Sequence, residues 1–156
     1  MDMKKTMLLL VPALAGCLGS APKPPVNWTI DIETGSKVAF AAVCAPYGGQ
    51  RFAVLRADGS VAFDPCNSFA ASPGSIIKDA VVGRRGEGAL FVRRLALDCR
   101  AEGRRDALVS VEIISGDRVG KGEAAEPTAD GNYSRAFSAA FAKAYAAAAE
   151  GLKQVK

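Results

Sequence analysis

A cysteine that follows two small residues near the N-terminus has the clearest chemical role in this sequence. Leu14, Ala15 and Gly16 precede Cys17, at the end of a short apolar run with a basic start. Such a run is typical of an export signal, whereas a membrane-spanning helix needs about 20 apolar residues. A cysteine directly after the small pair is typical of the lipobox that lipoprotein signal peptidase recognises. We therefore expect the thiol of Cys17 to carry lipid as the first residue of the mature chain.

This motif divides the chain into a signal peptide (1–16), a lipidated start with a flexible tether (17–25) and one domain (26–156). The alternative is an ordinary signal or a buried helix, with Cys17 an ordinary thiol. A lipoprotein cysteine carries three acyl chains. Each buried CH2 of such a chain contributes about 0.8 kcal/mol, so the three chains together form a permanent anchor on a membrane. An aspartate after the cysteine would be the inner-membrane retention signal. Leu18 stands there instead, which favours the periplasmic face of the outer membrane.

Composition limits the remaining function classes. Removing 16 residues from 156 leaves 140, enough for one domain with a core. The formal net charge of +4 becomes +3 when Asp2, Lys4 and Lys5 leave with the signal. The arginine pairs have no aromatic residues interleaved, so we expect solvated surface and no nucleic-acid partner. These pairs are Arg84 with Arg85, Arg93 with Arg94, and Arg104 with Arg105.

Histidine is absent from the whole chain. It is the commonest general base and metal ligand, and it activates most serine and cysteine nucleophiles. No Cys-x-x-Cys pair occurs, and residues 116–122 depart from the spacing of a phosphate-binding loop. We therefore expect no catalytic residue, no metal site and no cofactor besides the covalent lipid on Cys17.

Three cysteines remain once the lipidated one is set aside, in a compartment that permits disulfides. Cys44 ends one apolar run and Cys66 ends a third, and a hairpin of the second and third runs would bring Cys66 back near Cys44. We predict a bridge between them, which would contribute roughly 3 kcal/mol in the chain-entropy model if unstrained. The alternative is three reduced cysteines. Cys99 shares a strand face with Leu95 and Leu97 and is expected to be a buried free thiol.

The hydrophobic pattern predicts the strands around these residues. Alternating or continuous apolar runs predict strands at 26–32, 37–44, 51–56, 61–64, 89–99 and 107–115. The Asp58-Gly59 pair predicts a hairpin over 51–64. Residues 100–106 are expected to turn a second hairpin, and the polar, glycine-rich segment 116–131 is predicted to be a mobile loop.

Two helices complete the prediction. Ser72 as N-cap and Pro73 at the first helical position begin a short helix that Gly83 ends. An alanine-rich helix over 132–153 is expected to pack an apolar stripe on the core. The stripe comprises Phe137, Phe141, Ala144, Tyr145, Ala148 and Leu152. The predicted fold class is α/β, with a mixed, largely antiparallel sheet of about five to six short strands and two main helices, the longer one C-terminal.

The middle of the chain resembles a known family. The run VCAPYGGQRFAVLRADGSVAFDPCNSFAASPGSIIKDAV, from Val43 to Val81, is similar to the core of the ABC-type transport auxiliary lipoprotein family. The shared order is a lipobox, a short strand, a buried strand ending near proline, a hairpin with an arginine-containing segment, and an aromatic residue shortly before a proline-started helix. Phe69 and Pro73 occupy the last two places, and the likeness covers most of 26–152.

This resemblance implies a non-enzymatic auxiliary subunit that works with an ABC transporter and an MCE-domain protein to move lipids between membranes. Some relatives form homo-oligomers, which makes a second copy of this chain a further candidate partner. One alternative is a structural or assembly lipoprotein of the envelope without a transporter partner. Others are a thiol-dependent enzyme using Cys99, for which the sequence offers no base, and a carrier with an apolar groove between sheet and helices.

Overall fold

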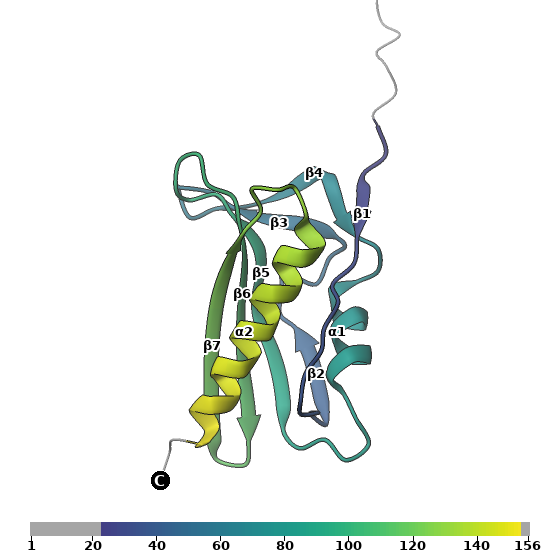
Figure 1. Ribbon diagram of the computed structural model, residues 1–156, viewed down its shortest axis with the longest axis vertical. Coiled ribbons are helices and arrows are strands. Elements are labelled where there is room, and N and C mark those ends of the chain that lie inside the picture. Colours follow the sequence, from purple (N-terminus) through teal and green to yellow (C-terminus); the bar gives the residue numbers. More distant parts are fainter. Residues whose placement is uncertain (1–22, 154–156) are drawn as a thin grey trace, which may run out of the picture.

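The computed structural model describes residues 23–153. Within them, the chain forms seven strands and two helices (Figure 1). The strands are β1 (Val26–Trp28), β2 (Phe40–Val43), β3 (Arg51–Leu55), β4 (Val61–Phe69), β5 (Ala89–Asp98), β6 (Asp106–Ser115) and β7 (Arg118–Pro127). The helices are α1 (Pro73–Val81) and α2 (Tyr133–Lys153). The α/β class with the longer helix at the C-terminal end is thus confirmed.

The strands form one mixed sheet in the order β1-β4-β3-β5-β6-β7, with β2 also paired to β5. The long pairings β5–β6 and β6–β7 are antiparallel, as is β3–β4, whereas β1–β4, β2–β5 and β3–β5 are parallel. Two short strands share one edge of β5, because β2 lies beside Ala89–Val92 and β3 beside Ala96–Asp98. The sheet therefore has more strands than the five to six predicted.

The local signals for turns and caps are confirmed. β3 and β4 form the predicted hairpin, and Gly59 in its turn has a φ of 82°, a left-handed conformation that glycine adopts without strain. The Ser72 hydroxyl accepts a hydrogen bond from the Ser75 amide at 3.3 Å, and Pro73 begins α1. β5 and β6 form the second hairpin.

The prediction of a mobile loop over 116–131 is wrong, because residues Arg118–Pro127 form β7. This strand pairs with β6 over its whole length and lies against α2. Its buried residues include Gly120 and Gly122, which face the helix where a side chain has no room. The strand therefore lacks the apolar alternation by which β-strands are recognised in a sequence.

The core lies between the sheet and the helices, and both helices contribute to it. The predicted stripe of α2 is buried there, with Leu152 partly exposed at the helix end. Phe69 packs against Phe52, with ring centroids 4.5 Å apart, and against Phe137 at 5.4 Å. The aromatic residue that the family resemblance singled out is thus a core residue that joins β4 to α2.

The long axis of the domain runs from β1 to the C-terminal end of α2 (Figure 1). Trp28 of β1 contacts Tyr133 at the start of α2, with ring centroids 5.2 Å apart, and Ser134 donates a hydrogen bond to the Thr29 carbonyl. α2 has 21 residues, so its two ends are about 30 Å apart. Neither helix within residues 23–153 is long and apolar enough to cross a membrane.

Candidate functional site

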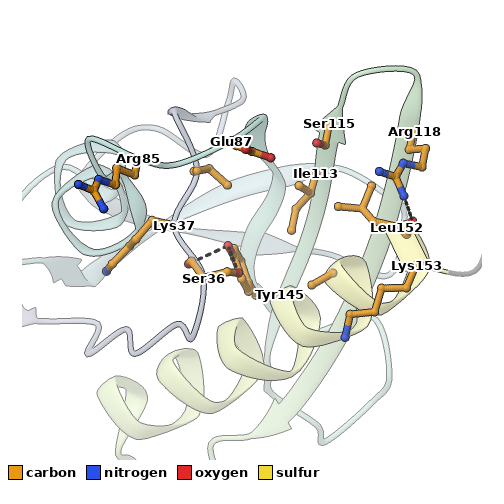
Figure 2. A pocket seen from close by; sticks show the side chains of 12 residues that line it. Ser36, Lys37, Arg85, Glu87, Ile113, Ser115, Arg118, Tyr145, Leu152 and Lys153 are labelled. Carbon is orange, nitrogen blue, oxygen red and sulfur yellow. Dashed lines mark hydrogen bonds between the residues drawn. The ribbon is translucent and has the colours of Figure 1, made fainter.

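A cleft of about 510 Å³ lies at the C-terminal end of α2 (Figure 2). Four separate stretches of the chain line it: the segment before β2, the loop before β5, the β6–β7 turn with the strand ends beside it, and the last turns of α2. The lining residues are Ser36, Lys37, Val38, Arg85, Glu87, Ile113, Ser115, Arg118, Tyr145, Ala149, Leu152 and Lys153. We call this site the cation-rimmed cleft.

Positive side chains dominate the rim of the cleft. Lys37 and Arg85 lie on one side and Arg118 and Lys153 on the other, with the floor between them (Figure 2). All four are exposed, and Glu87 is the single carboxylate among the lining residues. The rim therefore attracts anions.

A wider depression near the start of α2, about 700 Å³, has charges of both signs, with Asp31, Glu33 and Arg135 in its lining.

Two of the rim cations also contact helix ends. Lys37 donates a hydrogen bond to the Ala80 carbonyl near the end of α1, and Arg118 Nη1 donates to the Leu152 carbonyl at 3.3 Å. A positive charge there is favourable, because the carbonyl end of a helix carries partial negative charge. Each cation uses one N–H in this way, although a guanidinium has five and an ammonium three. Figure 2 shows the Lys37 ammonium turned away from the floor of the cleft, as its hydrogen bond to Ala80 requires.

The other two rim cations differ in their partners. Lys153 forms an exposed ion pair with Glu150 at 3.2 Å. Arg85 has no ion pair and no side-chain hydrogen bond to any residue of 23–153. Exposed ion pairs contribute little, about 0–1 kcal/mol. Within 23–153, the exposed Arg51, Arg56 and Arg84 likewise have no ion pair, so Arg85 is an ordinary exposed arginine in this respect.

The floor of the cleft is made of buried side chains and carries hydroxyl groups at its edge. Val38, Ile113 and Tyr145 are only 2%, 3% and 5% exposed. The Tyr145 hydroxyl lies 3.1 Å from the Ser36 carbonyl, to which it donates, and 3.2 Å from the Ser36 hydroxyl. Ser115 adds a further hydroxyl beside the apolar floor. The cleft thus combines positive charge, hydroxyl groups and a small apolar base.

Two glycines position Arg85 and Glu87 at the rim. A Cβ on Gly86 would lie 2.2 Å from the Val38 carbonyl, and one on Gly88 would lie 2.3 Å from the Ile114 carbonyl oxygen. The backbone of this loop therefore packs directly on the segment before β2 and on β6. Hydrogen bonds from Ala39 to the Gly88 carbonyl and from Gly83 to the Val38 carbonyl hold it there.

Several groups outside the cleft have shifted pKa values, among them Asp98 and Arg105 at the turn between β5 and β6. Hydrogen bonds from Arg100 hold the pKa of Asp98 below its usual value, against a smaller raising effect of burial. The Tyr133 hydroxyl raises the pKa of Arg105. Asp98 with Arg100, and Asp106 with Arg104, are ion pairs within or beside this turn. The shift of Asp98 therefore reflects an ion pair at the turn, and that of Arg105 reflects a hydrogen bond to the start of α2.

None of Cys44, Cys66 and Cys99 lines the cleft, whereas Arg85, Tyr145 and Leu152, which the sequence analysis named for other reasons, do. Leu14, Ala15, Gly16 and Cys17 lie outside the described residues. Cys44, Cys66 and Cys99 are free thiols, so the predicted Cys44–Cys66 bridge is not formed in the structure. The hairpin does form, but Cys44 follows a strand that pairs with β5, whereas Cys66 lies in β4, on the far side of β3.

Other sequence expectations can be compared directly with the described residues. Cys99 is free as expected, although it is half-buried at the edge of the core. The arginine pairs are exposed. No group of three or more His, Cys, Asp or Glu side chains within 23–153 is placed to hold a metal ion. The cleft was missed because its cations are single residues from four stretches, and no local motif connects them.

Comparisons with known proteins identify a shared fold. No family model matches the chain, and no curated protein matches it. A crystal structure of a Xanthomonas campestris protein of family DUF330 has a TM-score of 0.53 and 17% identity, and the match covers 76% of this chain and 86% of that one. A structure described as an uncharacterized protein has a TM-score of 0.45 and 10% identity, over 81% of this chain and 95% of its own. The chain shares its fold with the DUF330 protein.

Proposed function

We propose that this chain is a non-enzymatic auxiliary lipoprotein subunit of an ABC-type, MCE-associated transport system that moves lipids between membranes. The lipid on Cys17 anchors it to the periplasmic face of the outer membrane. The folded domain binds and positions a periplasmic partner, an MCE-domain protein or an ABC transporter subunit.

Two features of the sequence support this proposal. The lipobox at Leu14, Ala15, Gly16 and Cys17 accounts for attachment to a membrane. The resemblance of the run from Val43 to Val81 to the auxiliary lipoprotein family accounts for the partners. The likeness to the DUF330 structure is compatible with both, and it concerns the fold alone.

One structural observation carries the docking role: the cation-rimmed cleft and the point where the chain enters the domain lie at opposite ends. The chain enters at β1, which contacts the start of α2, whereas the cleft lies at the end of α2. Cys17 precedes β1 by nine residues, a distance of at most about 30 Å in a fully extended chain. In a domain attached at its β1 end, the cleft lies at the end farthest from the attachment point, where a periplasmic partner can reach it.

Site-specific crosslinking in the native envelope tests this proposal. A photoreactive amino acid at position 85 or 153, both exposed at the cleft, is expected to crosslink to an MCE-domain protein or an ABC transporter subunit. The matched control carries the same amino acid at Ser60, in the exposed β3–β4 turn. Mass spectrometry identifies the products. Crosslinks only to structural envelope proteins would contradict the proposal and favour an assembly lipoprotein.

The anchor is tested separately. Replacing residues 1–16 by an ordinary cleavable signal, together with Cys17→Ala, is expected to yield a soluble, folded periplasmic protein that no longer supports transport. Cys99→Ala in the native context is the matched control, and it retains the anchor. Full complementation by the soluble variant would contradict a role that depends on membrane attachment.

A further inference from the structure

We propose that β7 pairs edge to edge with β7 of a second copy of this chain, in an antiparallel dimer centred on Gly122. Such a dimer goes beyond the proposed function and requires no transporter partner. The backbone of β7, the order of its charges and the residues on its two faces all favour this pairing.

β7 is a long and regular edge strand. It is the last strand in the sheet order, and its residues Arg118–Pro127 pair with β6 without a register shift. No strand of residues 23–153 pairs with its other side, and Figure 1 shows β7 at the left margin of the sheet. β1 and β2, by contrast, have only three and four residues. A long edge presents a row of N–H and C=O groups that can pair with another strand.

The hydrogen bonds with β6 show which residues of β7 face outward. Thr128, just after the strand, donates its N–H to the carbonyl of Arg105, the residue opposite it in the register of this pair. Backbone groups of an antiparallel strand point alternately to its two sides, so the even-numbered residues of β7 bond to β6. Pro127, which has no N–H, is at an odd position, where it removes no bond to β6. The outward N–H and C=O groups are those of Val119, Lys121, Glu123 and Ala125.

The charged side chains of β7 follow an order that is complementary to itself. Arg118 and Lys121 lie in the first half of the strand, whereas Glu123 and Glu126 lie in the second half. When two antiparallel copies are centred on Gly122, Lys121 lies opposite Glu123 of the second copy. Arg118 then lies opposite Glu126 of that copy. Each pair occurs twice in the dimer, and opposite charges that face each other across two strands are stabilising.

The same charges select this register over its neighbours. The outward residues are odd-numbered, so two antiparallel copies can shift only in steps of two residues if their backbone bonds are to form. A shift in one direction places Lys121 opposite Lys121 of the second copy. A shift in the other direction places Glu123 opposite Glu123. Like charges directly opposite each other are destabilising, so the register centred on Gly122 is favoured.

The uncharged residues of β7 fit the pairing on both faces of the sheet. On the face away from α2, Val119 is 44% exposed and would lie opposite Ala125 of the second copy, which covers part of its apolar surface. On the face that contacts α2, Gly120 would lie opposite Ala124, and Gly122 opposite its own copy. Only small side chains therefore lie between the charged pairs on this face.

The internal ion pairs of the strand do not compete strongly with the dimer. Glu123 pairs with Arg94 at 3.4 Å, and Glu126 pairs with Lys143. All of these except Glu126 are well exposed, and exposed ion pairs contribute little. A carboxylate has two oxygens and can accept from two cations. Glu123 can therefore keep Arg94 and accept Lys121 of the second copy as well.

The symmetry of the dimer is compatible with two anchors in one membrane. The two-fold axis is perpendicular to the sheet, so the two β1 strands lie at opposite ends of the dimer. They lie at equal heights above a membrane that is parallel to the sheet. β1 and β7 are opposite edges of the sheet, so each β1 lies at an outer margin of the dimer, and both tethers can reach the same surface.

Sedimentation equilibrium of the purified mature lipoprotein, in an excess of density-matched neutral detergent, tests the proposal. Lys121→Glu and Glu123→Lys each place like charges opposite each other in a homodimer, so each should weaken dimerisation about fivefold or more. A one-to-one mixture of the two variants should dimerise as the wild-type protein does, because opposite charges then face each other at both pairs. Arg56→Glu, exposed next to the β3–β4 turn, makes the same change of charge and should leave dimerisation unchanged.

A proline variant distinguishes strand pairing from contact between charged surfaces. Ala125→Pro removes an outward N–H of β7 and no hydrogen bond to β6, so the fold should persist, as far-UV circular dichroism reports. Dimerisation should weaken about tenfold, because one backbone hydrogen bond is lost from each copy. Wild-type affinity in this variant would contradict pairing through the backbone.

Three further results would overturn the proposal: a wild-type protein that sediments as a monomer at every concentration, charge-reversed variants that dimerise as the wild-type protein does, or a mixture that fails to recover. Because sedimentation needs no partner protein, a failure here is distinct from a failure of the crosslinking experiment. Loss of crosslinks at the cleft with the dimer intact would overturn the proposed function and leave the β7 interface standing.

Discussion

Gly122 of β7 lies so close to Ala144 of α2 that a Cβ on the glycine would be 1.9 Å from the Ala144 carbonyl oxygen. Gly120 has the same relationship with Ala148, also at 1.9 Å. The two backbones are therefore in direct contact, and this contact fixes how closely the helix approaches the sheet. The cleft is built at the end of the same helix, so its geometry depends on these glycines.

Gly122→Ala is expected to lower the free energy of unfolding by about 2 kcal/mol or more, because the new methyl group forces backbone atoms apart in a packed core. Urea unfolding followed by circular dichroism measures the change. The matched control is Gly74→Ala in α1, where a Cβ meets open space. That replacement should stabilise the protein by about 0.4–1 kcal/mol. Equal stabilities of the two variants would contradict the close contact.

The part of the fold that local signals specify could be predicted from the sequence. Ser72 with Pro73 begins α1, the Asp58-Gly59 pair turns the β3–β4 hairpin, and the apolar stripe identifies α2. Each signal lies within a few residues of the element it specifies. Such signals reflect backbone preferences that hold whatever the rest of the chain does.

Features that depend on distant parts of the chain could not be predicted. β7 carries glycines where an isolated strand would carry apolar side chains, because α2 occupies that space. β2 and β3 share an edge of β5 through parallel pairings between segments far apart in sequence. The cleft likewise takes Arg85 and Arg118 from separate loops. Only the folded chain brings these residues together.

Ser72→Ala is expected to destabilise the protein by about 1 kcal/mol, because the hydroxyl accepts a hydrogen bond from the Ser75 amide at the start of α1. Ser72→Asp keeps an acceptor at the N-cap, so its stability should remain near that of the wild-type protein. Thermal and urea unfolding of both variants test this. A loss of stability in both would show that the Ser72 hydroxyl acts through another contact, such as its hydrogen bond with the Ser75 hydroxyl.

The Asp98–Arg100 pair predicts a contribution to acid sensitivity. Asp98 accepts hydrogen bonds from Arg100 Nε at 2.8 Å and Nη2 at 2.7 Å, and these bonds lower its pKa in the folded protein. A carboxyl whose pKa is lowered by folding adds stability that is fully present above its unfolded pKa, about 3.9, and is lost as the pH falls through the folded value. Stability should therefore fall below about pH 4.

Asp98→Asn is expected to lower the free energy of unfolding at pH 7 by about 1 kcal/mol, the typical net value of a hydrogen bond. The difference from wild type should shrink as the pH falls toward 2, because the wild-type carboxyl is then protonated as well. Urea unfolding at a series of pH values measures this. Asp117→Asn, at an exposed position without an ion pair in 23–153, is the control. A difference that stays constant with pH would show that the charge of Asp98 is unimportant.

The three thiols of the domain are expected to react with iodoacetamide at different rates. Cys66 is exposed in β4, whereas Cys44 and Cys99 are half-buried. Access limits alkylation of a folded protein, so Cys66 should be modified first, and all three should react once urea unfolds the chain. Mass spectrometry of timed samples assigns each site, and Cys66→Ser should remove the fast phase. A single reactive thiol in urea without reductant would mean that two of the cysteines are bridged after all, since a disulfide survives unfolding.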